Sequence, residues 1–173
     1  MKKTILAAVF AFALSASAGS AQAGGQEGTI GVGAEFGLAG SFDPGFGLLG
    51  GASGNYDAGK FHVGGFLGFA DPAGDDNTVY TFGARFYYHL HSTAMSDFGV
   101  GGQIGLLSVP DAVDPNEKDT LVFIEPGVQL RAFIASNVAL SFSVGIVIGA
   151  GDADGTFFGG QTTGAAGVHY YFF

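Results

Sequence analysis

Residues 80–90, YTFGARFYYHL, place apolar or aromatic side chains at every second position. One row contains Tyr80, Phe82, Ala84, Phe86, Tyr88 and Leu90, and the other contains Thr81, Gly83, Arg85 and His89. A period of two is the pattern of a β-strand with one apolar and one polar face. The formally charged residue of the stretch, Arg85, lies in the polar row. This stretch therefore predicts a strand whose two faces meet different surroundings.

The same alternation recurs along most of the chain after residue 29. Eight segments carry it, at residues 30–38, 46–56, 60–69, 80–90, 98–106, 122–134, 138–148 and 161–172. Short turns are expected at 57–59, 91–96 and 136–137, and longer connections at 39–45, 71–77, 108–119 and 149–156. Alternating long and short connections are typical of an antiparallel meander with its turns at one end and its loops at the other.

Charge is divided between the two faces of these segments. The charged residues within them are Glu35, Lys60, Arg85, Glu125 and Arg131, and all of them lie on the glycine-rich polar face. A charge facing lipid near the middle of a membrane costs ~2–4 kcal/mol, whereas charges inside a barrel can pair. A soluble lipocalin-like binder would instead carry many charges outside and apolar side chains inside. The partition favours an all-β fold: an eight-stranded antiparallel up-and-down transmembrane β-barrel.

Composition supports this fold class. The chain has 32 glycines and 18 phenylalanines, and 47% of its residues are hydrophobic. No segment after residue 23 contains the run of about 18 apolar residues that a spanning helix requires. The formal net charge is −9, and beyond residue 23 the basic residues are Lys60, Arg85, Lys118 and Arg131. Nucleic acid is therefore excluded as a partner, because phosphate binding needs clustered lysine and arginine.

The first residues have the pattern of an export signal. Lys2 and Lys3 precede the apolar run 5–14, and small residues follow as far as 21–23, AQA. This order is typical of a cleaved secretory signal peptide. We expect a signal peptide at 1–23 and a barrel domain at 24–173. The chain has no cysteine, so disulfides do not stabilise the exported domain.

The segment 167–173, GVHYYFF, resembles the terminal strand of bacterial outer-membrane proteins, which ends in an aromatic residue after alternating apolar positions. The whole region 24–173 resembles the small barrels of the OmpA/OmpX-like group. The resemblance implies a Gram-negative outer membrane, contact with its lipid and lipopolysaccharide, and Tyr170, Phe172 and Phe173 as a signal for the barrel-assembly machinery. Members often carry a second, peptidoglycan-binding domain, which we do not expect here. We expect a monomer.

The polar face suggests two functions. Glu35 and Glu125 are expected to meet Arg85, Arg131 and Lys60 across the lumen, because unpaired buried charges are costly. In OmpA-like barrels such networks close the lumen, which implies a structural or surface-interaction protein here. The alternative is a small gated channel or transporter, in which the inward glycines leave room for water.

Metal and enzyme chemistry receive less support. Ten acidic residues lie in the longer connections; the pairs Asp75, Asp76 and Asp152, Asp154 are the weak candidates for a divalent cation. The histidines His62, His89 and His169 point inward without ligand spacing, and no cofactor is expected. Some lipid-A deacylases are small barrels with a His-x-Ser pair. This chain has none, and Ser141 and Ser143 have no neighbouring histidine in the sequence, so we expect no enzyme.

One residue conflicts with the predicted strands. Pro126 lies inside the segment 122–134, and a closed barrel has no free edge at which a missing N–H group is harmless. We expect either a β-bulge at Pro126 or a shorter strand. Aromatic residues near the turn ends of the segments are expected to form a girdle: Tyr56, Phe61, Tyr88, Phe98, Tyr170 and Phe172.

Overall fold

A computed structural model describes residues 27–37, 50–71, 78–111, 114, 117–151, 155–157 and 165–172. The strands are β1 Thr29–Gly37, β2 Gly50–Asp57, β3 Phe61–Ala70, β4 Val79–Ser92, β5 Ser96–Pro110, β6 Lys118–Ala135, β7 Val138–Gly145, β8 Val147–Gly151, β9 Gly155–Phe157 and β10 Ala165–Phe172. The predicted signal peptide at 1–23 lies outside the described residues. In the described part of the chain, no helix is long and apolar enough to cross a membrane.

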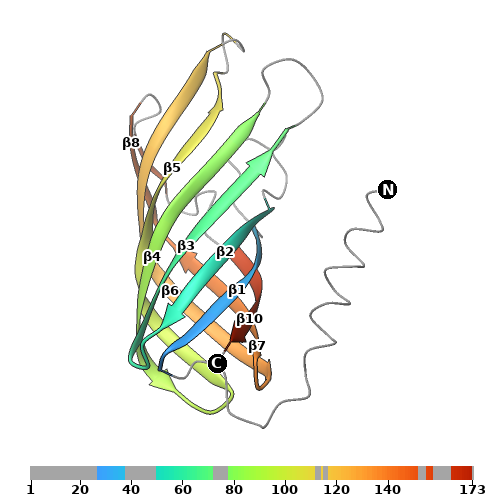
Figure 1. Ribbon diagram of the computed structural model, residues 1–173. Coiled ribbons are helices and arrows are strands. Elements are labelled where there is room, and N and C mark those ends of the chain that lie inside the picture. The colour runs from blue at the N-terminus through green and yellow to red at the C-terminus, as the bar shows by residue number, and fades with distance from the viewer. Residues whose placement is uncertain are drawn as a thin grey trace, which may run out of the picture.

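The strands form a closed antiparallel ring (Figure 1). Each of β1 to β6 pairs with its neighbour in the sequence, and β1 also pairs with β10. β7 and β8 pair with successive parts of β6, while β9 pairs with β8 and β10 with β7. These ten elements therefore occupy eight strand positions around the ring, which we call staves: β7 and β8 share one stave, and β9 and β10 share another. The prediction of an eight-stranded antiparallel up-and-down barrel is confirmed.

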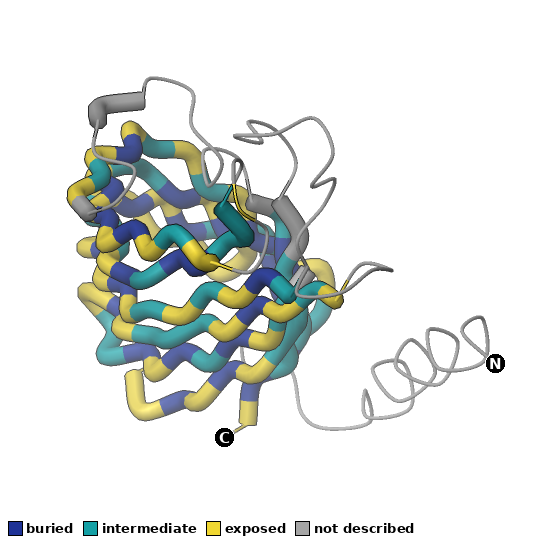
Figure 2. Tube along the Cα trace, turned by 90° about the horizontal axis from the view of Figure 1, so that it is seen from above, coloured by how far each residue is buried: buried dark blue, intermediate teal, exposed yellow. Residues whose placement is uncertain are grey.

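The two faces of the wall differ as the alternation predicts. On β4, Phe82, Phe86 and Tyr88 are exposed, whereas Arg85 and His89 are buried. Figure 2 shows the same alternation of buried and exposed residues along the other strands. The Gly-rich row faces the barrel interior, and the row of large apolar side chains faces outward.

The strands differ in length. β4, β5 and β6 have 14, 15 and 18 residues, whereas β1 has 9 and β10 has 8. At about 3.4 Å per residue, β6 is roughly 60 Å long. The rim therefore rises highest where β5 and β6 pair (Figure 1). We call this the loop end of the barrel, and the opposite end, with the turns at 58–60, 93–95 and 136–137, the turn end.

Two predicted connections are shorter than expected. The connection predicted at 108–119 is largely strand, because β5 continues to Pro110 and β6 begins at Lys118. Asp111 N donates to Glu117 O over 3.0 Å and closes this hairpin. At the turn end, β4 continues to Ser92 after an irregularity between His89 and His91, so His91 is an exposed strand residue and not part of the turn.

Pro126 does not cause the predicted bulge in its own strand. β6 is continuous, and Pro126 pairs with Gly102 of β5 without a shift in register. The break lies in the partner, where Ile146 separates β7 from β8, and the register is unchanged across it. Ile146 N donates to Pro126 O over 3.0 Å, which shows that the polar groups of Pro126 face β7 and β8. The missing N–H therefore interrupts that ladder without adding a residue.

Several inward glycines lie directly against a large side chain of another strand. A Cβ added to Gly31 would meet the ring of Tyr171, and one added to Gly83 would meet the ring of Phe66. The same relation joins Gly105 to Phe123, Gly145 to Glu125, and Gly149 to Leu121. Each glycine makes room for a large side chain of another strand, because an eight-stranded barrel is only wide enough for its own side chains.

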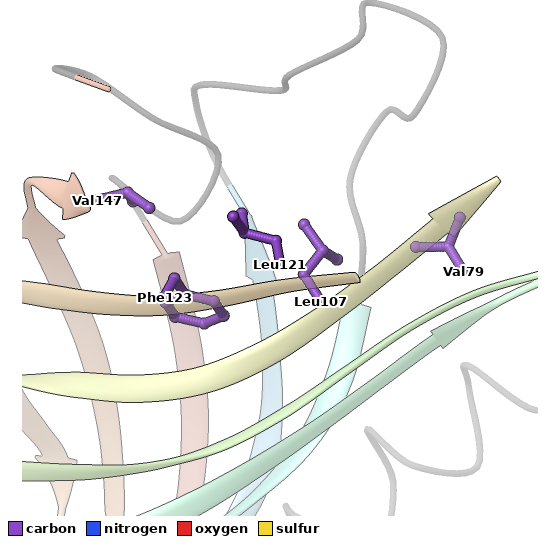
Figure 3. Packing of buried hydrophobic residues seen from close by; sticks show 5 residues of the cluster. All are labelled: Val79, Leu107, Leu121, Phe123 and Val147. Carbon is purple, nitrogen blue, oxygen red and sulfur yellow. The ribbon is translucent and has the colours of Figure 1, made fainter. Parts of the chain in front are cut away.

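An apolar cluster occupies the interior near the loop end. It consists of the buried residues Val79, Leu107, Leu121, Phe123 and Val147 (Figure 3). Phe66, Ala70 and Val109 pack against it. The predicted polar face gave no indication of this cluster, because its members are single apolar residues at inward positions near strand ends.

Candidate functional site: the charged interior

The first interior cluster is centred on Arg85 of β4. Arg85 Nη1 donates to Glu35 Oε1 over 2.6 Å, and Nη2 donates to Oε2 over 2.7 Å. Glu35 lies on β1, which is separated from β4 by β2 and β3, so this two-pronged ion pair crosses the lumen. The guanidinium carbon also lies 5.1 Å from the ring centre of Phe66. A bidentate arginine–carboxylate pair holds both charges in one orientation.

His169 of β10 completes the Arg85 cluster. Its Nε2 lies 3.0 Å from Glu35 Oε1 and 2.6 Å from Ser53 Oγ, while Nδ1 lies 3.3 Å from Ser141 Oγ. An ionised carboxylate only accepts, so Nε2 carries a hydrogen in this network. We define the Arg85 cluster as Glu35, Ser53, Arg85, Ser141 and His169. It connects β1, β2, β4, β7 and β10.

The second cluster is centred on Arg131 of β6. One nitrogen, Nη2, donates to Asp57 Oδ2 over 2.6 Å and to Asp97 Oδ2 over 2.7 Å. The other, Nη1, donates to the hydroxyl of Tyr171 over 2.9 Å. Arg131 has only 1% of its surface exposed and is the largest fully buried side chain among the described residues. Two carboxylates thus share one guanidinium.

Two histidines extend this cluster toward the turn end. His89 Nδ1 lies 2.8 Å from the carbonyl of Gly59, and a carbonyl only accepts, so Nδ1 is the donor. In the neutral ring, His89 Nε2 then accepts from His62 Nδ1 over 2.8 Å, and it lies 3.1 Å from Arg131 Nη2, whose two hydrogens point to Asp57 and Asp97. The neighbours therefore set one tautomer for each ring. We define the Arg131 cluster as Asp57, His62, His89, Asp97, Arg131 and Tyr171.

Glu125 is buried at an inward position of β6, two strands from Arg85 in the same row of paired residues. Its Oε2 accepts from Gln103 Nε2 over 2.6 Å, and Gln103 is its direct cross-strand partner on β5. Gly145 provides the space, because a Cβ there would collide with the Glu125 side chain. The predicted inward position of Glu125 is found, and the neighbour that the sequence analysis missed is an amide.

Lys60 does not belong to the interior, and its predicted place in the charge network is wrong. It is exposed in the turn between β2 and β3, outside both strands. Gly59, with φ of +79°, provides the left-handed residue of this turn, and Gly59 N donates to Asp57 Oδ1 over 2.9 Å. Asp57 therefore takes the last inward position of β2, and the chain has already turned when it reaches Lys60.

The remaining predicted site residues lie near chain connections and ends. Asp75, Asp76, Asp152 and Asp154 lie outside the described residues, as does Phe173. Phe172 is 51% exposed on the outer face, and its ring lies 4.9 Å from that of Tyr170. Tyr171, between them, points inward and is fully buried.

Three residues of the Arg131 cluster were missed by the sequence analysis. Asp57, Asp97 and Tyr171 each continue an inward row by one step beyond residues assigned to the polar face: Asn55, Gly99 and His169. The signal was therefore present in the alternation, but the predicted strands ended too early or the last aromatic residues were assigned to the outer face.

Three side chains of the Arg131 cluster have the spacing of a metal site. Ligand atoms of Asp57, His89 and Asp97 all lie within 4.8 Å of one another, a spacing that could hold a metal ion. Arg131 Nη2 already contacts each of the three. An internal guanidinium thus takes the place that a cation would have.

The geometry also bears on nucleophilic catalysis. Ser141 does have a histidine neighbour, His169 of β10, which the sequence could not show. Ser141 Oγ lies 3.3 Å from Nδ1 and Glu35 Oε1 lies 3.0 Å from Nε2, so the serine and the carboxylate are on opposite nitrogens, as in a Ser-His-carboxylate triad. However, Arg85 holds Glu35 in a bidentate pair, and Ser53 Oγ also contacts Nε2 over 2.6 Å. His169 is also only 1% exposed. The arrangement is that of a hydrogen-bonded ion pair.

An eight-stranded barrel with an apolar exterior and paired charges inside is the architecture of the OmpA-like outer-membrane barrels, so the predicted resemblance is confirmed for the fold. The N-terminal β-barrel domain of OprF from Pseudomonas aeruginosa is 14% identical, with a TM-score of 0.58, over 84% of this chain and 98% of that one. Ail, the attachment invasion locus protein of Yersinia pestis, is 12% identical, with a TM-score of 0.41, over 85% and 100%. No family description and no curated protein sequence matches the chain.

Proposed function

We propose that this protein is a lipid-embedded outer-membrane barrel with a structural or surface-interaction role and no enzymatic activity. The exterior of the barrel carries the proposal. Phe69, Leu67, Ile104 and Val144 are 64%, 58%, 53% and 53% exposed on the outer face. A monomer in water rarely exposes contiguous apolar surface of this kind, whereas hydrocarbon removes its cost.

The distribution of charge supports the same proposal. In the described strands, Glu35, Asp57, Arg85, Asp97, Glu125 and Arg131 all lie inside the barrel. The other charged residues of these strands, Lys118 and Asp119, are the first two residues of β6, at the loop end. The middle of the outer wall is therefore uncharged in the described part of the chain, as hydrocarbon requires.

The contacts inside the barrel favour a structural role over a wide open channel. The Arg85 cluster joins staves on opposite sides of the lumen, and the Arg131 cluster joins β6 to β2, β4, β5 and β10. Large side chains occupy the space beside the inward glycines. The charged interior thus ties the strands together and stiffens the barrel in this proposal.

A small cation-selective channel is the second candidate, and one observation favours it. The inward acids Glu35, Asp57, Asp97 and Glu125 outnumber the inward bases Arg85 and Arg131 in the described strands. An acidic lumen favours cations. In planar bilayers, stable openings that change with Arg85→Met or Arg131→Met would support the channel.

Export and assembly belong to the same proposal. Residues 1–23 direct the chain across the inner membrane, and Tyr170, Phe172 and Phe173 present the aromatic ending to the barrel-assembly machinery. The exterior then contacts lipid and lipopolysaccharide as a monomer. The outward positions of Tyr56, Phe61, Tyr88 and Phe98 near the turn end support an aromatic girdle at the inner boundary of the membrane.

Cell fractionation with two matched variants tests the proposal. Ile104→Arg places a charge in the middle of the outer wall, and Met95→Arg places the same charge in the exposed turn between β4 and β5. We expect the unmodified protein and Met95→Arg in the outer-membrane fraction, extracted only by detergent and migrating differently on gels after heating. Ile104→Arg should lose most of this population. Detergent-free release of the unmodified protein with the periplasm would contradict the proposal and favour the lipocalin-like alternative.

A further inference from the structure

The interior of the barrel is divided into three layers. Along β4, from the loop end to the turn end, Val79 of the apolar cluster comes first, then Arg85, then His89. Along β6 the same direction runs through Leu121 and Phe123 to Arg131. β4 thus gives the order of the apolar cluster, the Arg85 cluster and the Arg131 cluster, and β6 agrees for the first and the last.

The two charged layers contain polar atoms that need further partners. Asn55 Oδ1, Gln129 Oε1, His62 Nε2, Arg85 Nε and Arg131 Nε are buried and have no hydrogen-bond partner among the described residues. Buried polar atoms are rarely left without a partner, and water is the smallest molecule that can satisfy them. These layers therefore have the chemistry that retains water.

The apolar layer has the opposite chemistry. The side chains of Val79, Leu107, Leu121, Phe123 and Val147 offer no hydrogen bond, and none is more than 8% exposed. Phe66 borders the Arg85 layer, with its ring 6.4 Å from that of Phe123 and 5.1 Å from the Arg85 guanidinium carbon. The side chains of Phe66, Phe123 and Leu121 also occupy the space beside Gly83, Gly105 and Gly149. The cluster side chains offer entering water no hydrogen bond, and the hydroxyl of Thr81, the cross-strand partner of Leu107, already donates to Leu106 O over 3.0 Å.

We propose that the apolar cluster, and not the ion pairs, is the permeability barrier of this barrel, and that the two charged layers on its turn-end side are hydrated. The inference rests on the proposed lipid-embedded barrel. An ion in the charged layers can exchange part of its hydration for carboxylates and hydroxyls. In the apolar layer it would have to give up that hydration without replacement, and narrow apolar constrictions exclude ions by dewetting. Breaking an ion pair alone therefore leaves the barrel closed.

Conductance of the purified full chain in planar bilayers tests this inference. Leu121→Ser opens the apolar layer to water, and Val122→Ser is its matched control, one residue along β6 on the outer face. The double variant Arg85→Met/Glu35→Gln removes the ion pair while leaving no uncompensated charge. We expect Leu121→Ser to raise potassium conductance by about tenfold or more, because the barrier height enters the rate exponentially. Val122→Ser and the double variant should stay at the level of the unmodified protein.

Opposite results would overturn the inference. They are conductance in the unmodified protein, conductance that appears with Arg85→Met/Glu35→Gln, or a Leu121→Ser barrel that remains closed. Heat-modifiable migration verifies that each variant is folded. Should Leu121→Ser fail to fold, the nearly isosteric pair Val79→Thr/Val147→Thr makes the same test with little change in volume. Failure of the proposed function is recognised separately, because the unmodified protein would then not insert into the bilayer.

Discussion

The two arginine clusters differ in how charge is balanced. Arg85 faces one carboxylate, Glu35, in a bidentate pair, whereas Arg131 faces two, Asp57 and Asp97, through a single nitrogen. One guanidinium thus meets one carboxylate at Arg85, whereas two carboxylates share the guanidinium of Arg131. Two buried arginines of one barrel thus face different numbers of carboxylates, so their removal should not cost the same free energy.

The structural reach of the two clusters also differs. Arg85 and Glu35 join two staves directly, while the Arg131 side chain contacts residues of β2, β4, β5 and β10. Its loss would leave two buried carboxylates, Asp57 and Asp97, without their shared counter-charge. Removing one partner of a buried pair is far more costly than removing both. We therefore expect substitution of Arg131 to cost more stability than substitution of Arg85 when unfolding is measured with urea in detergent.

The largest effect is expected for Arg131→Met. Two buried carboxylates lose their counter-charge, so we expect a loss of about 5 kcal/mol in the free energy of unfolding. Circular dichroism follows the transition, because the chain has no tryptophan. The double variant Arg131→Met/Asp97→Asn should recover part of the loss. A loss smaller than that of Arg85→Met would contradict the ranking of the two clusters.

The next effect is expected for Arg85→Met. One carboxylate, Glu35, loses its counter-charge but keeps the contact with His169, and its side chain is 13% exposed, so we expect a loss of about 3 kcal/mol. Arg85→Met/Glu35→Gln should be more stable than Arg85→Met, since no buried charge is left unpaired. Additive losses from the two substitutions in a double-mutant cycle would show that the pair is not coupled.

A smaller effect is expected where a glycine makes room for a cluster residue. Gly31→Val pushes against the ring of Tyr171, the hydroxyl partner of Arg131, and should cost about 1–3 kcal/mol. Gly54→Val is the matched control on the neighbouring strand, because its Cβ would meet only open space and the carbonyl of Gly31 at 3.8 Å. The control should change stability by less than about 0.5 kcal/mol. Equal losses in both variants would contradict a packed interior at Gly31.

The smallest effect is expected for Lys60→Ala. The side chain is exposed in the turn between β2 and β3, outside both clusters. The free energy of unfolding should therefore change by less than about 0.5 kcal/mol. A loss near that of Arg85→Met would contradict the exposed position of Lys60 and favour the predicted place of Lys60 in the interior charge network.

The sidedness of each strand could be predicted from the sequence alone. Arg85, Arg131, Glu35 and Glu125 point inward as their positions in the alternating rows indicate, and the histidines His62, His89 and His169 do so as well. Alternation is a local property of an extended chain, so it needs no knowledge of the neighbouring strands. The same alternation located Pro126 in a strand, but it did not show that the interruption would lie in the partner at Ile146.

Only the tertiary structure decided which inward residues meet. Glu35 and Arg85 are 50 residues apart and Asp57 and Arg131 are 74 apart, so their contacts depend on the closure of the ring and the stagger between strands. Strand stagger also brings inward apolar residues of β4, β5, β6 and β8 together near the loop end, although no single segment of the sequence contains an apolar inner face. Alternation indicates the face on which a residue lies, whereas its height in the barrel, and hence its partner, follows from the register of all eight staves.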